Sequence, residues 1–165
     1  MNKKYDVGFY GGKFIPFHKG HLFCTGIMAK ECKKGYLIMF IGGDQEIKIL
    51  NNIHDENLLP KSRWEVVKRV ASMYENITPV IIDVTDVKLE DGTEDWDGET
   101  PLVRAVCGDK IDAVYSSEIS YGEYFSRAYP EAAHRLVDPP RLTYPISATK
   151  IRNMKNEKER EKWIM

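Results

Sequence analysis

The segment from Gly11 to His21 places reactive and charged side chains between a β-rich run and a predicted helix. Gly11 and Gly12 let the backbone approach a ligand closely. His18 and His21 are three residues apart, which puts them on one face of a helical first turn. Free N–H groups and the positive end of the helix dipole favour a phosphate there, and Lys13 adds positive charge. The segment therefore predicts a phosphate site.

A second segment with phosphate-binding character runs from Asp138 to Arg152. Ser147 is a good N-cap for the helical stretch that it opens. Thr149 falls in the first turn, and Arg152 follows three residues later on the same face. Hydroxyls, free N–H groups and a guanidinium that matches phosphate oxygens bidentately therefore converge on one point. Taken alone, this segment also fits a capped helix without a ligand.

The elements expected around these two segments alternate between strands and helices. Strands are expected at residues 5–10, 36–41, 80–84, 113–115 and 135–137. Helices are expected at residues 19–34, from 60 to about 74, at 100–108 and 120–129, and from 147 onwards. This order favours an α/β fold, a single Rossmann-like domain over residues 1–165 with a doubly wound parallel sheet and a helical tail at 153–165. Ligands lie beyond the carboxyl ends of such strands, so the important loops are 11–21, 42–46, 85–99, 116–122 and 138–150.

Length and composition set the general class. A chain of 165 residues suits one domain, and 24 Lys and Arg against 25 Asp and Glu argue against a broad nucleic-acid surface. The longest apolar run, residues 36–41, is far shorter than the roughly 20 residues of a membrane span. The first residues show no signal-peptide apolar region, and the three cysteines lack metal-ligand spacing. We expect a cytoplasmic protein that binds neither nucleic acid nor membrane.

The two segments together resemble the two signatures of the nucleotidylyltransferase superfamily of the His-x-Gly-His class. The string from Gly11 to His21 is similar to nicotinamide-nucleotide adenylyltransferases. Other stretches resemble the adenylyltransferase domain of a bifunctional adenylyltransferase/ribosylnicotinamide kinase: Val137-Asp-Pro-x-Arg141 followed by Ile146-Ser-Ala-Thr-Lys-Ile-Arg152, and Tyr115-Ser-Ser-Glu118. The resemblance covers nearly all 165 residues, so we expect neither the kinase domain nor a DNA-binding module within them.

The resemblance implies transfer of AMP from ATP to nicotinamide mononucleotide, giving NAD and pyrophosphate. The catalytic residues that it implies are His18, His21, Lys13 and Arg152. The ATP-binding residues that it implies are Gly11, Gly12, Lys13, Phe14, His18, His21, Arg141, Ser147, Thr149 and Arg152. Mg²⁺ would bind through the ATP phosphates and water, and the sequence shows no carboxylate cage, so no protein metal ligand is predicted.

The acceptor side of the site centres on Trp96, which is predicted to lie in the acidic loop 90–99. An indole face attracts a pyridinium ring by cation–π interaction, and related enzymes place a Trp in a comparable region. Ordinary packing of Trp96 against the domain is the alternative. Arg63 and Arg141 are expected as phosphate contacts, with surface salt bridges as the alternative. The predicted substrate-binding residues are Trp96, Gly42, Arg63, Ser117 and Glu118.

Two other functions remain open. One is a different nucleotidylyltransferase that acts on phosphopantetheine, flavin mononucleotide or an alcohol phosphate, although such families open with Gly-x-Phe-Asp. The other is a non-catalytic sensor of NAD or ATP, which would have no chemical use for His18, His21 and Arg152 together. Nicotinamide and nicotinate mononucleotide share phosphate and ribose, so the sequence leaves both open as acceptors. Related enzymes also lead us to expect a homo-oligomer.

Overall fold

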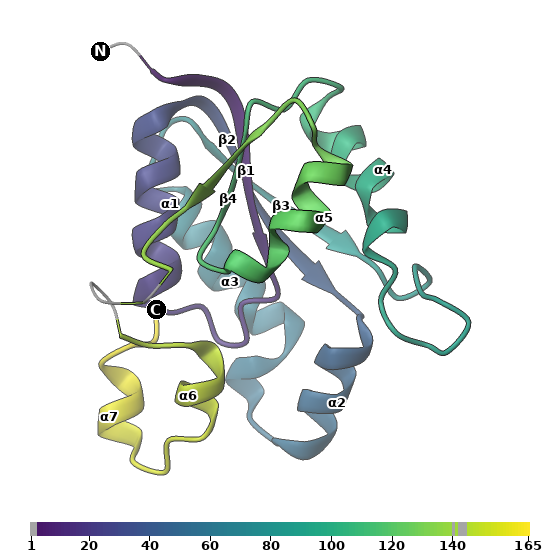
Figure 1. Cartoon of the computed structure of the whole chain (residues 1–165). Helices are drawn as coiled ribbons and strands as arrows, with labels where there is room; N and C mark the ends of the chain where they lie inside the picture. The colour runs from purple at the N-terminus through teal and green to yellow at the C-terminus, as the bar shows by residue number, and fades with distance from the viewer. Residues whose placement is uncertain (1–2, 140, 142–144) are drawn as a thin grey trace.

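The computed structural model describes residues 3–139, 141 and 145–165. Five parallel strands form its sheet in the order β3-β2-β1-β4-β5. Their bounds are β1 (Tyr5–Gly12), β2 (Cys32–Ile41), β3 (Ile77–Asp83), β4 (Ala113–Ser116) and β5 (Ala133–Leu136). The strand order changes direction between β1 and β4, and ligands bind at such a point in open α/β sheets. The predicted Rossmann-like α/β fold is confirmed (Figure 1).

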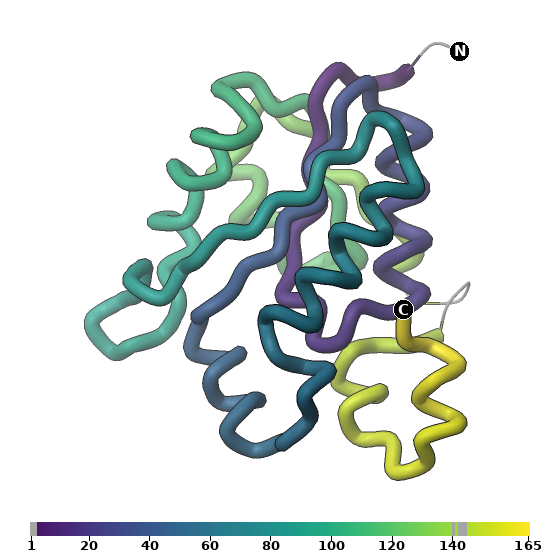
Figure 2. Tube along the Cα trace, turned by 180° about the vertical axis from the view of Figure 1, so that it is seen from behind, coloured from purple at the N-terminus to yellow at the C-terminus, as the bar shows by residue number. Residues whose placement is uncertain are grey.

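Helices cover both faces of the sheet (Figures 1 and 2). On one face lie α1 (Lys19–Glu31) and α3 (Pro60–Ala71), and on the other lie α4 (Trp96–Cys107) and α5 (Gly122–Ala128). Leu37 and Met39 of β2 pack in the α1/α3 cluster, whereas Ile38 between them packs in the α4/α5 cluster. Side chains alternate along a strand, so a strand covered on both faces needs an uninterrupted apolar run.

The remaining short elements include α2 (Asp44–Asn52), η1 (Glu56–Leu58), η2 (Ile119–Tyr121), α6 (Ala148–Arg152) and α7 (Glu157–Glu161). Figure 1 shows α2, α6 and α7 beyond the carboxyl ends of the strands. After α7 the chain pairs with the segment from Gly11 to His21, which is called the first signature segment below. The Lys19 N–H donates to the Trp163 carbonyl at 2.8 Å, and the Met165 N–H donates to the Phe17 carbonyl at 3.1 Å. The last residues therefore hold the start of α1 in place.

Several predicted boundaries are wrong, and three of them have a clear local cause. The helix expected to reach residue 34 ends at Glu31, because Cys32 is already extended and opens β2. The helix expected from residue 100 begins at Trp96, because the Asp95 side chain caps it by accepting from the Gly98 N–H at 3.1 Å. The region 42–46, expected as a loop, contains the first turn of α2.

Within the described ranges, no helix has both the length and the apolar character needed to cross a membrane.

Candidate active site

A cleft of about 450 Å³ lies where the segments after β1 and β4 meet α4 and α6. Every predicted site residue except Gly42 and Arg63 lines it. The first segment contributes Gly11, Gly12, Lys13, Phe14, His18 and His21, and the second contributes Arg141, Ser147, Thr149 and Arg152. Trp96, Ser117 and Glu118 complete the predicted set. Residues 140 and 142–144 of the second segment lie outside the described residues.

The two imidazoles form a reciprocal cap at the start of α1. The Nδ1 atom of His18, the N-cap residue, accepts from the Gly20 N–H at 3.0 Å. The Nδ1 atom of His21 accepts from the His18 N–H at 3.1 Å. A capping box of this kind satisfies two otherwise free N–H groups. Gly20 is needed because an added Cβ would lie 2.8 Å from Cε1 of His18.

Both imidazoles are neutral at pH 7. Burial, and then the Arg141 charge, lowers the pKa of His18 to about 4. Burial lowers the pKa of His21 well below its usual value, with smaller contributions from His18 and Arg141. A neutral ring that accepts at Nδ1 carries its proton on Nε2. Each ring therefore keeps one Nε2–H donor, and formal positive charge must come from other residues.

Arg152 supplies part of that charge and joins the two signature segments. One guanidinium nitrogen donates to the Ile15 carbonyl at 2.6 Å, and another donates to Oγ1 of Thr149 at 3.2 Å. The Ser147 Oγ caps α6 by accepting from the Lys150 N–H at 3.1 Å. Segments about 130 residues apart in the sequence thus form one cationic wall of the cleft.

Arg141 connects the second segment to the loop after β4. It adopts a positive φ of 55°, and its guanidinium donates to the Ile146 carbonyl at 3.1 Å and forms an ion pair with Glu118. The predicted phosphate contact and the alternative salt bridge are thus not exclusive, since Arg141 lines the cleft while it is ion-paired.

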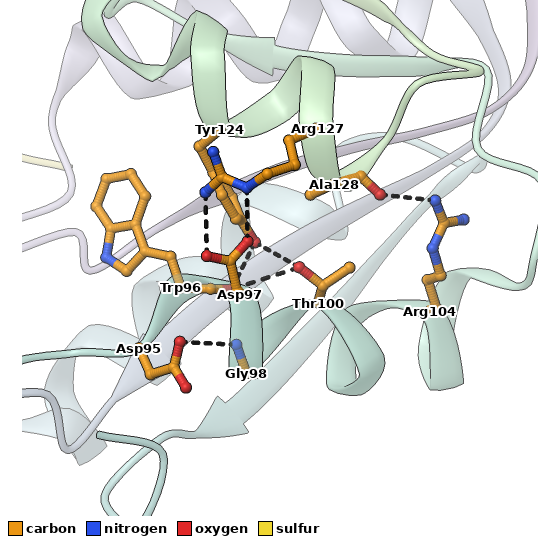
Figure 3. A network of polar contacts seen from close by, with 9 residues as sticks. All are labelled: Asp95, Trp96, Asp97, Gly98, Thr100, Arg104, Tyr124, Arg127 and Ala128. Atoms are coloured by element: carbon orange, nitrogen blue, oxygen red, sulfur yellow. Dashed lines mark hydrogen bonds and ion pairs between the residues drawn. The ribbon is translucent and has the colours of Figure 1, made fainter. Parts of the chain in front are cut away.

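Trp96 lies at the first position of α4 and not in a loop, so that prediction is wrong. Its ring packs edge-on against Tyr121 and Tyr124, with ring centroids 5.0 and 5.3 Å apart. The Trp96 carbonyl accepts from the Tyr124 hydroxyl at 2.7 Å (Figure 3). Although packed, Trp96 remains 36% exposed and lines the cleft.

Two further carboxyl groups line the cleft and are missed by sequence reasoning. Glu94 forms an ion pair with Lys13 at 2.8 Å. Burial, and then repulsion by Glu94, raises the pKa of Glu99 to about 8. Both carboxyls flank Trp96 in the acidic stretch, and one helical turn separates Trp96 from Glu99. That spacing is the signal that could have found Glu99.

Arg63 and Gly42 are placed behind the cleft. The Arg63 guanidinium is buried, forms an ion pair with Glu46 and donates to the Lys13 carbonyl at 2.6 Å. The Gly42 N–H donates to the other oxygen of Glu46, and Gly42 lines a separate cavity of about 370 Å³ beside Thr85. The structure therefore does not bring these two predicted residues to the cleft, and the alternative of a surface salt bridge for Arg63 is also wrong.

No family model matches the chain. No curated protein matches it by sequence either. Among solved structures, NadR protein in complex with NAD and AMP-PNP is similar, with a TM-score of 0.65 and 22% identity over 99% of this chain and 46% of that chain. A bifunctional NMN adenylyltransferase/ADP ribose pyrophosphatase from Francisella tularensis has a TM-score of 0.59 and 24% identity over 90% of this chain and 41% of that chain. TmcAL from Thermotoga maritima, bound with alpha-thio ATP, has a TM-score of 0.51 and 15% identity over 97% of this chain and 53% of that chain.

This chain spans less than half the length of the first two of these proteins. Its fold resembles that of the nicotinamide-nucleotide adenylyltransferases, in agreement with the resemblance carried by its two signature segments.

Proposed function

We propose that this protein transfers AMP from ATP to the phosphate of nicotinamide mononucleotide, forming NAD and releasing pyrophosphate. The observation that carries the proposal is the single cleft shared by the His18/His21 pair and Arg152. Its position at the change of strand order is where an α/β sheet binds nucleotides. The similar fold of an NMN adenylyltransferase supports the same assignment.

The reaction needs no protein nucleophile. A phosphate oxygen of the mononucleotide attacks the α-phosphorus of ATP, the bond to the β-phosphate oxygen breaks, and pyrophosphate leaves. The protein has to align two anions and stabilise the charge that develops on the phosphoryl oxygens. In this proposal the Nε2–H groups of His18 and His21 donate to those oxygens, with His21 nearest the transferred phosphoryl group.

The charged residues around the imidazoles have a separate task. Arg152, with Ser147 and Thr149 beside it, is proposed to hold the β- and γ-phosphates. Lys13 is ion-paired with Glu94 at 2.8 Å, so its ammonium is already held at the cleft when ATP arrives. The backbone of Gly11 and Gly12 then lies close to the nucleotide.

Mg²⁺ is proposed to arrive with the ATP phosphates, whose charge it would neutralise. Within the described ranges, no group of three His, Cys, Asp or Glu side chains is placed to hold a metal ion. In this proposal the cation keeps its water and phosphate ligands, as Mg²⁺ commonly does. A Francisella tularensis structure of the similar fold contains AMP and a Mn ion.

The test is pyrophosphate release and NAD formation by the purified protein with ATP, Mg²⁺ and nicotinamide mononucleotide. Reactions without the mononucleotide measure background ATP hydrolysis. Phosphopantetheine, flavin mononucleotide and an alcohol phosphate are tested as competing acceptors. Absence of pyrophosphate release with nicotinamide mononucleotide overturns the proposal, and release with another acceptor reassigns the substrate.

A further inference from the structure

A buried carboxyl group with an unpartnered oxygen lines the cleft one helical turn after Trp96. Glu99 and Trp96 are spaced i, i+3 on α4, which places them on one face, and both line the cleft. Glu99 is only 6% exposed, and its Oε1 atom has no hydrogen-bond partner among the described residues. A buried acceptor without a hydrogen bond destabilises the protein by its desolvation free energy, so a donor group on a ligand at this position would offset that free energy.

A second carboxyl group makes this position sensitive to charge. Glu94 lies beside Glu99 and is ion-paired with Lys13 at 2.8 Å. The pKa of Glu99, raised to about 8 by burial and by Glu94, keeps Glu99 protonated at neutral pH. Glu94 is the neighbouring carboxylate that helps raise this pKa, so we assign it as the acceptor of the Glu99 proton. The oxygen left over is an acceptor.

We propose that Glu99, positioned beside Glu94 and Trp96, selects a carboxamide over a carboxylate on the pyridine ring of the acceptor. This specificity role rests on the proposed function. A carboxamide N–H donates to the free Glu99 oxygen. A carboxylate brings only acceptors and a negative charge, so it leaves that oxygen unpaired and is repelled by Glu94. Trp96 contacts either pyridinium ring and does not discriminate between them.

The experiment compares kcat/KM for nicotinamide mononucleotide with kcat/KM for nicotinate mononucleotide. A site built around a hydrogen bond rejects ligands that lack the donor, and we expect the wild-type protein to favour the amide by more than about tenfold. In Glu99→Leu the side chain keeps roughly its size and loses both carboxyl oxygens, whereas the neutral side chain of Glu99→Gln keeps a donor for Glu94 and an acceptor for the carboxamide. The ratio of Glu99→Leu should fall by about tenfold or more, through poorer use of nicotinamide mononucleotide, while the ratio of Glu99→Gln and KM for ATP are unchanged.

Asp97→Asn is the matched control on the same helix. Asp97 is exposed, forms a bidentate ion pair with Arg127 at 3.0 Å (Figure 3), and is not among the residues that line the cleft. Asp97→Asn removes a carboxylate charge two residues from Glu99, so a general electrostatic effect of the acidic stretch on the ratio would appear in this variant. The proposal expects the ratio of Asp97→Asn to equal that of the wild-type protein.

Three outcomes overturn the proposal. The first is a wild-type protein that uses both mononucleotides with equal efficiency, which needs no variant. The second is a folded, active Glu99→Leu protein with an unchanged ratio, and the third is an equal change in Asp97→Asn. If no acceptor yields pyrophosphate, the proposed function fails, and calorimetric affinities for the two mononucleotides then decide the selectivity separately, since equal affinities overturn it.

Discussion

The imidazole rings of His18 and His21 stack with their centroids 3.7 Å apart, and the backbone N–H of His18 donates to Nδ1 of His21. The same backbone geometry that starts α1 therefore fixes the tautomer of both rings. Two Nε2–H donors result without any formal charge, at a helix N-terminus that already favours anions. These two donors can stabilise the negative charge that develops on a phosphoryl oxygen in the transition state. Because they carry no formal charge, they do not neutralise the attacking phosphate of the mononucleotide in the ground state.

Replacing His21 by Ala should reduce kcat by about 10²–10³-fold, the usual cost of one lost donor to a developing oxyanion. The dissociation constant for NAD should change much less, because the other cleft residues remain. Turnover is measured by pyrophosphate release and NAD binding by calorimetry.

His21→Gln is the control for the cap, because Gln at this position of a capping box accepts from the same N–H group. It should recover the melting temperature lost in His21→Ala. A protein in which His21→Ala weakens NAD binding and turnover equally would favour the sensor over the enzyme.

The stability of the fold should decrease as the pH falls from about 6.5 to about 4. The pKa of His18 is about 4 in the folded protein and near 6.5 in the unfolded chain, so the unfolded chain binds more protons in this window. One such group changes the free energy of unfolding by up to about 1.4 kcal/mol per pH unit. Urea unfolding at pH 7, 6 and 5 measures the slope.

His18→Asn keeps an N-cap acceptor and removes the titrating ring. Its free energy of unfolding should depend less on pH than that of the wild-type protein in the same window. Identical slopes for the two proteins would show that His18 is not held neutral in the fold.

Trp96→Ala should raise KM for the mononucleotide by about 5–30-fold, which corresponds to the roughly 1–2 kcal/mol of a cation–π contact. KM for ATP should change little, because the phosphate-binding residues lie in other segments. Trp96→Phe keeps a ring and should lose less. Because Trp96 also packs on Tyr121 and Tyr124, melting temperatures must accompany the kinetics. Equal losses in both KM values would indicate a packing role alone.

Arg152→Ala should lower kcat/KM for ATP by roughly 30- to 1000-fold, equivalent to about 2–4 kcal/mol of transition-state stabilisation. The side chain also donates to the Ile15 carbonyl, so the first signature segment loses its tie to α6. Arg152→Lys keeps the charge but not the planar fork, and it should recover only part of the rate. Lys150→Ala, on the exposed side of the same short helix, is the control and should behave as wild type. Full recovery in Arg152→Lys would mean that charge alone matters at this position.

The sequence predicts the phosphate side of the cleft well, because its chemistry lies in two contiguous strings. The glycines, imidazoles and hydroxyls of the site are visible in those two strings. The uninterrupted apolar run of β2 separately indicates a sheet that is covered by helices on both faces. Trp96 is misplaced because the acidic residues and Pro101 hide the start of α4, whose cap is a single Asp95 side chain. Glu99 is missed because its one signal, the i, i+3 spacing from Trp96, is visible only once α4 is known to begin at Trp96.

Arg63 shows a different limit of prediction from sequence. Its role depends on a residue 17 positions away, on a helix that the sequence does not predict. Glu46 is the first-turn residue of α2 that meets the guanidinium, and both side chains are buried. Long-range pairing of two charged residues has no local signature. Both look like surface residues until the fold places them behind Lys13, whose carbonyl accepts from Arg63.

This placement yields a prediction that separates structural support from phosphate contact. Glu46→Gln leaves the Arg63 charge buried without its carboxylate and should destabilise the fold by about 3–5 kcal/mol. Arg63→Met should also destabilise it, and the double variant should lose less than the sum of the two, because the charges act as a pair. Urea unfolding of the four proteins gives the coupling energy. A phosphate contact would behave differently, since Arg63→Met would then raise KM for ATP at wild-type stability, and Glu46→Gln would leave both quantities unchanged.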